Sequence, residues 1–296
     1  MGYQVDNAII MAAGLSSRFA PISYEKPKAL IEVRGEVLIE RQIRQLLEAG
    51  INKIILIVGY KKEQFYYLTQ KYGVSIIENK DYLTRNNHSS IYAARNHLGN
   101  SYICSADNYF TANPFEKEVE DTYYSAQFTS GSTDEWCLQT DKHGWITDIK
   151  IGGCHQWFMI GHAFWNEFFS RKFVQILEDI YEDNTTKGKL WETVYKEHIT
   201  QLKMKIRCYE SNDIYEFDSL DELRLFDHKY LNNSGSLIMQ ELSRKLNCSE
   251  SEMTNMKPLL SDKGKIIGVL FQCKKNNYCY NYETKELVQH CLNISD

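Results

Sequence analysis

The fold class is indicated by one segment near the N-terminus, Asn7-Ala8-Ile9-Ile10-Met11-Ala12-Ala13-Gly14-Leu15-Ser16-Ser17-Arg18. Residues 8–11 form an apolar run typical of a buried strand, and small residues follow it. A strand that runs into a loop of small residues lets backbone N–H groups approach an anion closely. The stretch therefore predicts a strand and an anion-binding loop at the edge of a sheet.

The chain on either side of this loop alternates between helical and strand patterns up to residue 106. Strands are predicted over 53–58, 74–78 and 101–106, and helices over 37–50, 61–72 and 89–98. Strands that alternate with helices of this length favour a parallel sheet with helices on both faces.

From residue 122 the pattern changes to strands in succession, which extend the sheet in mixed orientation. Strands are predicted over 122–129, 135–140, 145–151, 156–164, 203–209 and 214–217, with helices over 167–182 and 190–198 and a further helix opening at Ser219. We therefore expect an α/β fold with a Rossmann-like, mixed and mostly parallel central sheet flanked by helices. This first domain is expected to span residues 1–230.

Residues 231–296 have their own pattern and are expected to form a small α+β annex of a helix and a hairpin. The helix is predicted over 237–246 and the two strands over 266–273 and 278–282. No motif in the annex has catalytic spacing, so its role is not predicted.

Composition excludes several classes of function. The 296 residues carry 34 basic and 39 acidic side chains, a formal charge of −5, with no long basic block, so a nucleic-acid partner is not expected. The apolar runs are far shorter than the roughly 18 residues of a membrane span, and no signal peptide is evident, so we expect a cytoplasmic protein without membrane insertion. The eight cysteines form no C-x-x-C pair and are expected to be reduced.

Basic residues next to the small-residue loop suit a triphosphate. Arg18 closes the loop, and Lys26-Pro27-Lys28 follows shortly after. The loop matches neither the dinucleotide fingerprint nor the common ATPase loop. The alternative interpretation is a tight turn bordered by solvated basic side chains.

Two acids, Asp107 and Asp218, each follow a predicted strand. The carboxyl ends of strands are where ligands bind in open α/β sheets. A pair of carboxylates around a triphosphate describes a Mg²⁺ site, since Mg²⁺ prefers carboxylate, phosphate and water oxygens.

Aromatic residues in the second half of the chain suit a cationic head group, because ring faces attract quaternary ammonium ions. Trp136 and Trp191 are the preferred candidates because each has an acid beside it, and Glu192 is one of these acids. Trp157, next to Phe158, is interpreted as a core residue. Strand alternation places Glu216 on the same face as Asp218, so Glu216 is expected to face the head group.

The chain up to about residue 230 resembles the bacterial CTP:phosphocholine cytidylyltransferases of the sugar-phosphate nucleotidyltransferase superfamily. Besides the loop and Lys26-Pro27-Lys28-Ala29-Leu30, the motifs that carry the resemblance are Gly59-Tyr60-Lys61-Lys62-Glu63-Gln64-Phe65, Asn86-Asn87 with Ser90, Ala106-Asp107-Asn108-Tyr109, Asp134-Glu135-Trp136 and Ile214-Tyr215-Glu216-Phe217-Asp218-Ser219. The family's Trp-Asp pair appears here as Trp191-Glu192.

The resemblance implies a Mg²⁺-dependent enzyme that converts CTP and phosphocholine into CDP-choline and pyrophosphate. Lys28 is expected to bridge the α-phosphate and the incoming phosphate, Arg18 and the loop amides to hold the other phosphates, and Asp107 and Asp218 to bind the metal. The nucleotide-binding residues are expected to be Ala12, Ala13, Gly14, Leu15, Ser16, Ser17, Asn87 and Ser90, with cytosine near Ala12, Asn87 and Ser90.

Alternatives remain open at this stage. The second substrate can instead be phosphoethanolamine, an aminophosphonate or a sugar 1-phosphate, and a regulatory module that binds nucleotide or choline without turnover is a further possibility. His88 is not expected to act as a base, because the attacking phosphate is already anionic. The annex resembles the start of a choline-kinase-like module through Leu246-Asn247-Cys248 and Asn255-Met256-Lys257-Pro258, but without the kinase loops no kinase activity is predicted.

Overall fold

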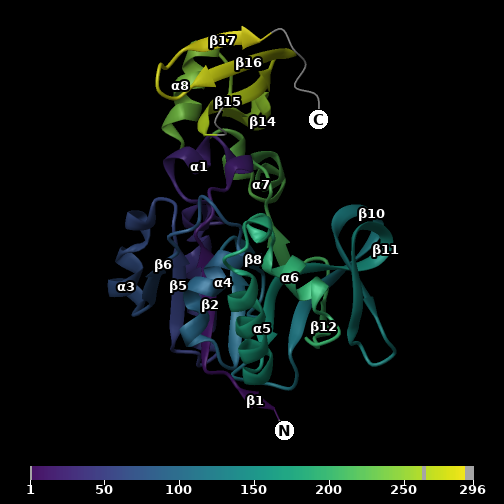
Figure 1. Cartoon of the computed structure of the whole chain (residues 1–296). Coiled ribbons are helices and arrows are strands. Elements are labelled where there is room, and N and C mark those ends of the chain that lie inside the picture. The colour runs from purple at the N-terminus through teal and green to yellow at the C-terminus, as the bar shows by residue number, and fades with distance from the viewer. Residues whose placement is uncertain (1, 262–264, 291–296) are drawn as a thin grey trace. The chain divides into compact units, whose positions relative to one another are not determined.

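The computed structural model describes residues 2–261 and 265–290, and it divides into two compact units (Figure 1). The first unit comprises Met1–Gly14 and Leu38–Glu216, and the second comprises Leu15–Val37 and Phe217–Asp296. Each unit is described by itself below. None of the helices in the described residues is long and apolar enough to span a membrane.

A mixed sheet forms the centre of the first unit. Its strands, in spatial order, are β12 (Lys205–Tyr209), β10 (Tyr123–Thr140), β11 (Ile146–Trp165), β7 (Ser101–Ser105), β2 (Asn7–Ala12), β5 (Ile54–Val58) and β6 (Ser75–Glu78). The β7-β2-β5-β6 strands are parallel, β12 is parallel to β10, and β11 is antiparallel to both of its neighbours. The predicted mixed, mostly parallel α/β sheet is thereby confirmed.

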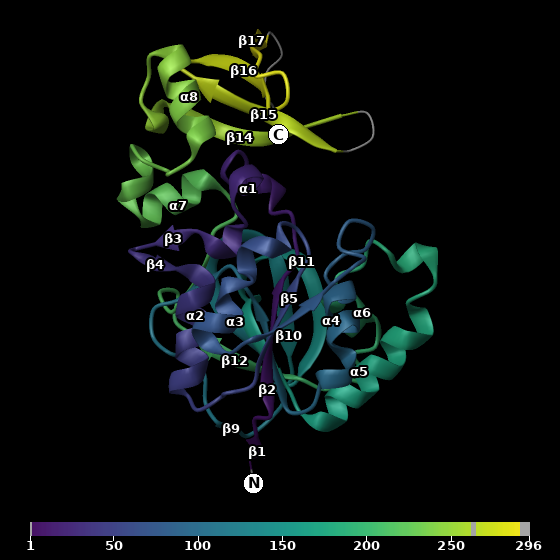
Figure 2. The same cartoon turned by 90° about the vertical axis from the view of Figure 1, so that its left-hand side faces the viewer.

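Helices cover both faces of this sheet, as predicted. They are α2 (Leu38–Glu48), α3 (Tyr67–Tyr72), α4 (His88–Ala94), α5 (Glu167–Ile180) and α6 (Trp191–Glu197). Figure 2 shows α2 on one side of the strands and α4 and α5 on the other. Fully buried residues of the parallel strands, such as Ile9, Ile57 and Ile103, form the core with the helices.

The four strands predicted over 122–164 are in fact two long strands, β10 and β11, that pair with each other. The pairing shifts register at several points, for example between Tyr124 and Ala126 and between Thr129 and Ser132. Such bulges bend a strand without ending it. Because a bulge interrupts the alternation of polar and apolar residues, the sequence pattern suggested breaks where the strands continue.

The second unit contains the residues that follow the small-residue loop. Its elements are the 3₁₀ turns η1 (Ser17–Phe19), η2 (Lys28–Leu30), η6 (His228–Leu231) and η7 (Glu250–Glu252), the helices α1 (Ile22–Glu25), α7 (Leu220–Phe226) and α8 (Leu237–Leu246), the short hairpin β3 (Glu32–Val33) and β4 (Glu36–Val37), and the strands β14 (Met253–Leu260), β15 (Ile266–Cys273), β16 (Asn276–Asn281) and β17 (Leu287–His290). The last four strands form an antiparallel sheet in the order β14-β15-β16-β17.

The annex therefore differs from the predicted helix and hairpin. The helix over 237–246 and the strand over 266–273 are confirmed, but two further strands, β14 and β17, complete the sheet. The strand β14 was not predicted, because its sequence contains Pro258 and shows no alternation of polar and apolar residues.

The compact units also do not follow the expected boundary at residue 230. The hydroxyl of Tyr230 donates to the Glu32 carbonyl at 2.6 Å, and Asp227 accepts from the Arg34 N–H at 2.7 Å. These contacts tie the segment before residue 230 to Leu15–Val37. Nothing in the local sequence pattern indicates pairing between segments so far apart in the chain.

Candidate active site

The predicted site residues lie in both units, and in the first unit they begin at the end of β2. The carbonyl of Ala13 accepts a hydrogen bond of 3.1 Å from the Tyr60 N–H. Gly59 allows this close approach, because a Cβ at that position would lie 2.9 Å from the Ala13 oxygen. At Gly14, by contrast, a Cβ would meet no atom within 4 Å. The loop that follows Ala12 therefore starts from a backbone fixed at Ala13, and there is unfilled space next to the chain at Gly14.

Ser90 lies at the start of α4 and is almost completely buried. Its hydroxyl accepts a hydrogen bond of 3.2 Å from the Asn79 side chain, which also donates to Ser89 at 2.8 Å. The backbone N–H of Asn79 donates to Val58 at the end of β5. A small polar cluster thus fixes the start of α4 at the carboxyl ends of the parallel strands.

Asn87 holds the start of α6 rather than presenting a free amide. Its Oδ1 accepts from the Trp191 N–H at 2.7 Å, and its Nδ2 donates to the Glu192 carboxylate at 3.2 Å. The hydroxyl of Tyr124 donates to the other oxygen of Glu192 at 3.2 Å. Burial raises the pKa of Glu192 to about 7. Glu192 is thus a half-buried acid held by Asn87 and Tyr124.

Trp191 is a core residue, which corrects its predicted role in the head-group pocket. Its side chain is 1% exposed, and its ring stacks on Tyr124 at 5.4 Å between centroids. The edge of Trp165 lies against it at 5.1 Å. A ring enclosed in this way presents no face to a cation. Composition and spacing cannot separate such a residue from an exposed aromatic, because both occur beside acids.

Trp136 differs from Trp191, because it is only half-buried where β10 pairs with Ile151 of β11. Trp157, interpreted from sequence as core, is also half-buried and contacts the edge of Phe128 at 5.5 Å. Of the two tryptophans chosen from sequence, only Trp136 has accessible surface for a ligand.

Asp107 lies in the turn after β7, and its neighbours hold the carboxylate in place. The hydroxyl of Ser105 donates to Oδ1 of Asp107 at 2.6 Å. The Ser105 carbonyl in turn accepts from the buried amide of Gln42 on α2 at 3.0 Å. Sequence reasoning did not identify Ser105 or Gln42, and no motif marks them.

The strand β8 (Asn108–Phe110) that follows Asp107 brings a second acid to the same place. It pairs with β13 (Ile214–Glu216), so that Asn108 is opposite Glu216. The amide of Asn108 donates to the Glu216 carboxylate at 3.4 Å. Glu216 is exposed. The predicted metal acid Asp107 and the predicted head-group acid Glu216 are therefore neighbours across one strand pair, although 109 positions separate them in the sequence (216 − 107).

In the second unit, Arg18 and Asp218 form an ion pair with Nη1 and Oδ2 2.7 Å apart. Asp218 precedes α7, whose Glu222 accepts from the Asp218 N–H at 2.7 Å. Ser219 caps the helix by accepting from the Glu222 N–H, which confirms the predicted helix start at Ser219. Ser16 has a left-handed backbone with φ of 48°, which turns the loop into η1. Two predicted site residues thus meet within this unit.

Lys28 opens η2 and is only 6% exposed. Its Nζ lies 5.6 Å from the ring centroid of the buried Phe19. Lysines are rarely buried to this extent, because their charge is costly to remove from water.

His88 is fully buried, and burial lowers its pKa. Its Nδ1 lies 2.6 Å from the Lys189 carbonyl, and its ring meets the edge of Tyr181. The imidazole is therefore enclosed by protein groups, with one ring nitrogen at a backbone carbonyl.

The fit of these residues to Mg²⁺ depends on their oxygen atoms. The described residues contain no group of three or more His, Cys, Asp or Glu side chains that could hold a metal ion by themselves. Mg²⁺ bound to a nucleotide does not need such a cluster, because one or two carboxylates and the phosphates suffice. Asp107 in the first unit, whose carboxylate is oriented by Ser105, and Asp218 in the second unit each supply a carboxylate of this kind.

Comparison with known proteins agrees with this geometry. Residues 8–119 match the family model of the MobA-like NTP transferase domain. The 2-aminoethylphosphonate cytidylyltransferase of Lancefieldella rimae is 38% identical over 76% of this chain and 93% of its own. The choline-phosphate cytidylyltransferase of Streptococcus pneumoniae is 37% identical over 73% of this chain and 95% of its own.

Solved structures show the same likeness. The CTP:phosphocholine cytidylyltransferase of Streptococcus pneumoniae superposes with a TM-score of 0.73 at 36% identity, covering 76% of this chain and 99% of that one. The inositol-1-phosphate CTP transferase of T. maritima, with a TM-score of 0.60 and 16% identity, shares the fold.

Proposed function

Because the chain belongs to the family of choline-phosphate and 2-aminoethylphosphonate cytidylyltransferases, we propose that it converts CTP and phosphocholine into CDP-choline and pyrophosphate. It is a nucleotidyltransferase. In the proposed reaction, a phosphate oxygen of phosphocholine attacks the α-phosphorus of CTP in line. A new phosphorus–oxygen bond forms there, the bond to the β-phosphate bridging oxygen breaks, and pyrophosphate leaves.

The protein's part in this reaction is positioning and charge neutralisation, since no covalent bond to the enzyme is needed. We assign the β- and γ-phosphates to the backbone amides of 14–17 and to Arg18. Lys28 bridges the α-phosphate and the attacking phosphate, and its near-complete burial supports a fixed position. Ala12, Asn87 and Ser90 belong to the cytosine side by resemblance; because the Asn87 amide is already bonded, its proposed role is to hold α6.

Asp107 and Asp218 are proposed to bind Mg²⁺. When bound, the metal neutralises negative charge that develops on the transferring phosphoryl group. The hydrogen bond from Ser105 keeps the Asp107 carboxylate oriented, which supports its assignment as a metal ligand. Arg18 offsets the charge of Asp218 at 2.7 Å.

The head group is proposed to lie near Trp136, Glu216 and Glu192. The observation that carries this assignment is the pairing of β8 with β13. This pairing places Glu216 opposite Asn108, the residue after Asp107. Asp107 is proposed to bind the metal at the phosphates, and the Glu216 carboxylate suits a cationic head group. Carboxylates and a half-buried tryptophan suit an ammonium better than a sugar, which would require donors and acceptors aimed at its hydroxyls.

A second candidate is 2-aminoethylphosphonate, favoured by the relative that is 38% identical. Its primary ammonium donates directional hydrogen bonds, whereas a trimethylammonium cannot. The half-buried Glu192, held by Asn87 and Tyr124, would accept such a bond most strongly when ionised.

A pyrophosphate-release assay tests the proposal. It uses CTP, UTP, ATP and GTP, each with phosphocholine, phosphoethanolamine, 2-aminoethylphosphonate and glucose 1-phosphate. We expect turnover with CTP and the highest kcat/KM with phosphocholine. A higher value with the phosphonate would select the second candidate, and no release with any pair would indicate a binding module.

A further inference from the structure

We propose that the C-terminal segment, residues 231–296, positions the phosphate-binding segment, residues 15–28, for CTP, with Glu25 as the positioning residue. The inference rests on the proposed function of residues 15–28. It gives a role to the annex, for which the sequence provided none. Both segments belong to the second unit.

Glu25 links the two segments directly. Its Oε1 accepts from the backbone N–H groups of Leu237 at 2.9 Å and Ile238 at 3.2 Å, at the first turn of α8. Ser236 caps the same helix by accepting from Met239 at 3.1 Å. A carboxylate at a helix N-terminus gains both from these donors and from the helix dipole. The contact therefore fixes Glu25 more firmly than a surface ion pair would.

Two further contacts link residues 15–28 to the C-terminal segment. The ring of Tyr24, the residue before Glu25, stacks on Tyr282 with 4.0 Å between centroids. The turn η1, which contains Arg18, lies against β14. In both overall views α1 lies beside β14 (Figures 1 and 2). Residues 15–28 are thus held by the C-terminal segment at two points, η1 and the end of α1.

The position of Glu25 in the chain carries this restraint to Lys28. Only Lys26 and Pro27 separate them, and the ring of the buried Pro27 fixes its own φ at −52°. Lys28 then begins η2 with little freedom. Holding Glu25 therefore limits where the Lys28 ammonium can point.

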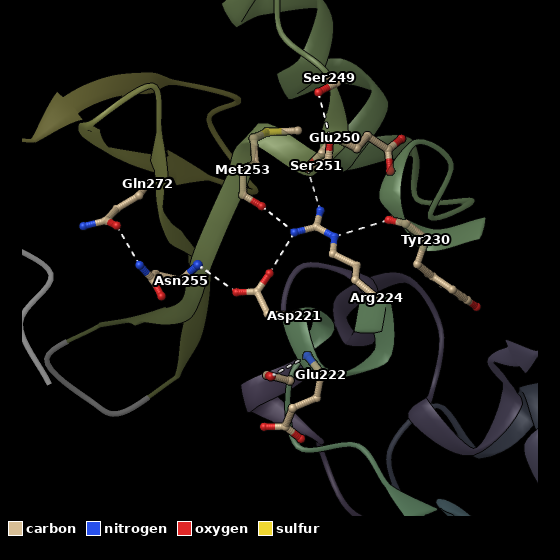
Figure 3. Close-up of polar contacts among 11 residues, drawn as sticks. Asp221, Glu222, Arg224, Tyr230, Ser249, Glu250, Ser251, Met253, Asn255 and Gln272 are labelled. Carbon is tan, nitrogen blue, oxygen red and sulfur yellow. Dashed lines mark hydrogen bonds and ion pairs between the residues drawn. The ribbon is translucent and has the colours of Figure 1, made fainter. Parts of the chain in front are cut away.

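The C-terminal segment holds the α7 side of the unit as well, through buried Arg224 (Figure 3). The guanidinium donates to the carbonyls of Met253 and Glu250, each at 2.6 Å, and to Asp221 at 2.9 Å. The other oxygen of Asp221 accepts from the Asn255 N–H at 3.0 Å. Asp218 precedes α7, and Arg18 lies in η1. The strand β14 contacts both of these elements, so it holds the backbone next to each residue of the Arg18–Asp218 pair.

Steady-state kinetics of the full-length chain test the inference. Glu25→Ala removes the acceptor, Glu25→Gln keeps one accepting oxygen, and Tyr24→Ala removes an exposed ring from the stack. Because a misplaced phosphate-binding group can cost up to about a hundredfold, we expect Glu25→Ala to raise KM for CTP roughly tenfold. KM for phosphocholine should rise less than KM for CTP, because Arg18 and the loop amides are assigned to CTP alone, whereas only Lys28 is proposed to contact both substrates. Glu25→Gln should behave like the wild type and Tyr24→Ala should lie between.

Glu40→Ala provides a matched control. Glu40 is a buried carboxylate on α2 that accepts from Tyr67, Lys71 and Tyr72, all within the first unit. Its loss lowers stability without touching residues 15–28, so both KM values should remain those of the wild type. Hydrogen exchange of residues 15–28 completes the test: we expect faster exchange in Glu25→Ala and, to a smaller extent, in Tyr24→Ala, but not in Glu40→Ala.

The outcomes separate this inference from the proposed function. If the wild type turns CTP over and both KM values are unchanged in Glu25→Ala and Tyr24→Ala, the inference is overturned, whatever the exchange rates. If Glu25→Ala does not fold, the KM for CTP of Tyr24→Ala is the test. A raised value supports the inference, and an unchanged value overturns it. If the wild type itself releases no pyrophosphate, the proposed function is overturned, and this inference with it.

Discussion

Nη1 of Arg18 lies 2.7 Å from Oδ2 of Asp218, although 200 positions separate the two residues. The Arg18 side chain is 73% exposed, and exposed ion pairs contribute little to stability. The pair is therefore better understood through the ligands proposed for each residue, phosphate for Arg18 and metal for Asp218. Removing either side chain should affect catalysis much more than folding.

Asp107→Ala and Asp218→Ala should each lower kcat by orders of magnitude, because each removes a proposed metal ligand. Pyrophosphate release at varied Mg²⁺ measures the effect, and thermal unfolding checks that the fold is retained. Asp148→Ala is the control, since Asp148 lies on β11, where it accepts from the Ile149 N–H at 2.8 Å and pairs with Lys150 at 3.8 Å. Turnover retained in either aspartate variant would remove that residue from the site.

Lys28→Ala should lower kcat/KM for CTP and for phosphocholine together. A single cation that touches both the α-phosphate and the attacking phosphate stabilises the transition state more than either bound substrate. Initial rates with each substrate varied in turn give the two values. If only KM for CTP rises while kcat is unchanged, Lys28 binds the nucleotide alone and does not bridge.

Trp136→Leu should weaken the preference for phosphocholine over phosphoethanolamine, because the ring face that attracts a trimethylammonium is lost. A cation–π contact of about 0.5–2 kcal/mol corresponds to roughly 2- to 30-fold in relative kcat/KM. Trp157→Leu serves as the matched control, because Trp157 is equally half-buried on β11. Equal selectivity in both variants and the wild type would show that Trp136 does not contact the head group.

Trp191→Leu should instead destabilise the fold, by about 2–4 kcal/mol, because it leaves a cavity among packed rings. Urea unfolding measures the loss. The preference for phosphocholine over phosphoethanolamine should stay close to that of the wild type, since the Trp191 ring is enclosed by Tyr124 and Trp165. Altered selectivity without loss of stability would contradict its place in the core.

Glu192 should make folding stability depend on pH. Burial raises its pKa from the ordinary 4.5 to about 7, so the folded chain binds this proton more tightly than the unfolded chain. Stability is then fully present below about pH 4.5 and falls as pH rises towards about 7, where the folded acid also ionises. Glu192→Gln resembles the neutral acid and should remove this fall. Urea unfolding from about pH 5 to pH 8 compares the two, and parallel curves would refute the assignment.

The sequence predicted those parts of the molecule that local patterns determine. The apolar run at residues 8–11, the alternation of strands and helices, and the acid after β7 all follow from periodicity and spacing. Trp191 was assigned wrongly, because an aromatic beside an acid looks the same in a core as in a pocket. The Asn108–Glu216 and Arg18–Asp218 contacts were not predictable, because each joins segments far apart in the chain.

The second unit is discontinuous, since its segments Leu15–Val37 and Phe217–Asp296 are separated in the chain by Leu38–Glu216 of the first unit. During synthesis the early segment leaves the ribosome long before its partner exists, and a long loop must close before their contacts can form. The unit that contains Arg18, Lys28 and Asp218 can therefore assemble only after nearly the whole chain has been made. A nascent chain would fold its central sheet first and become competent for CTP last.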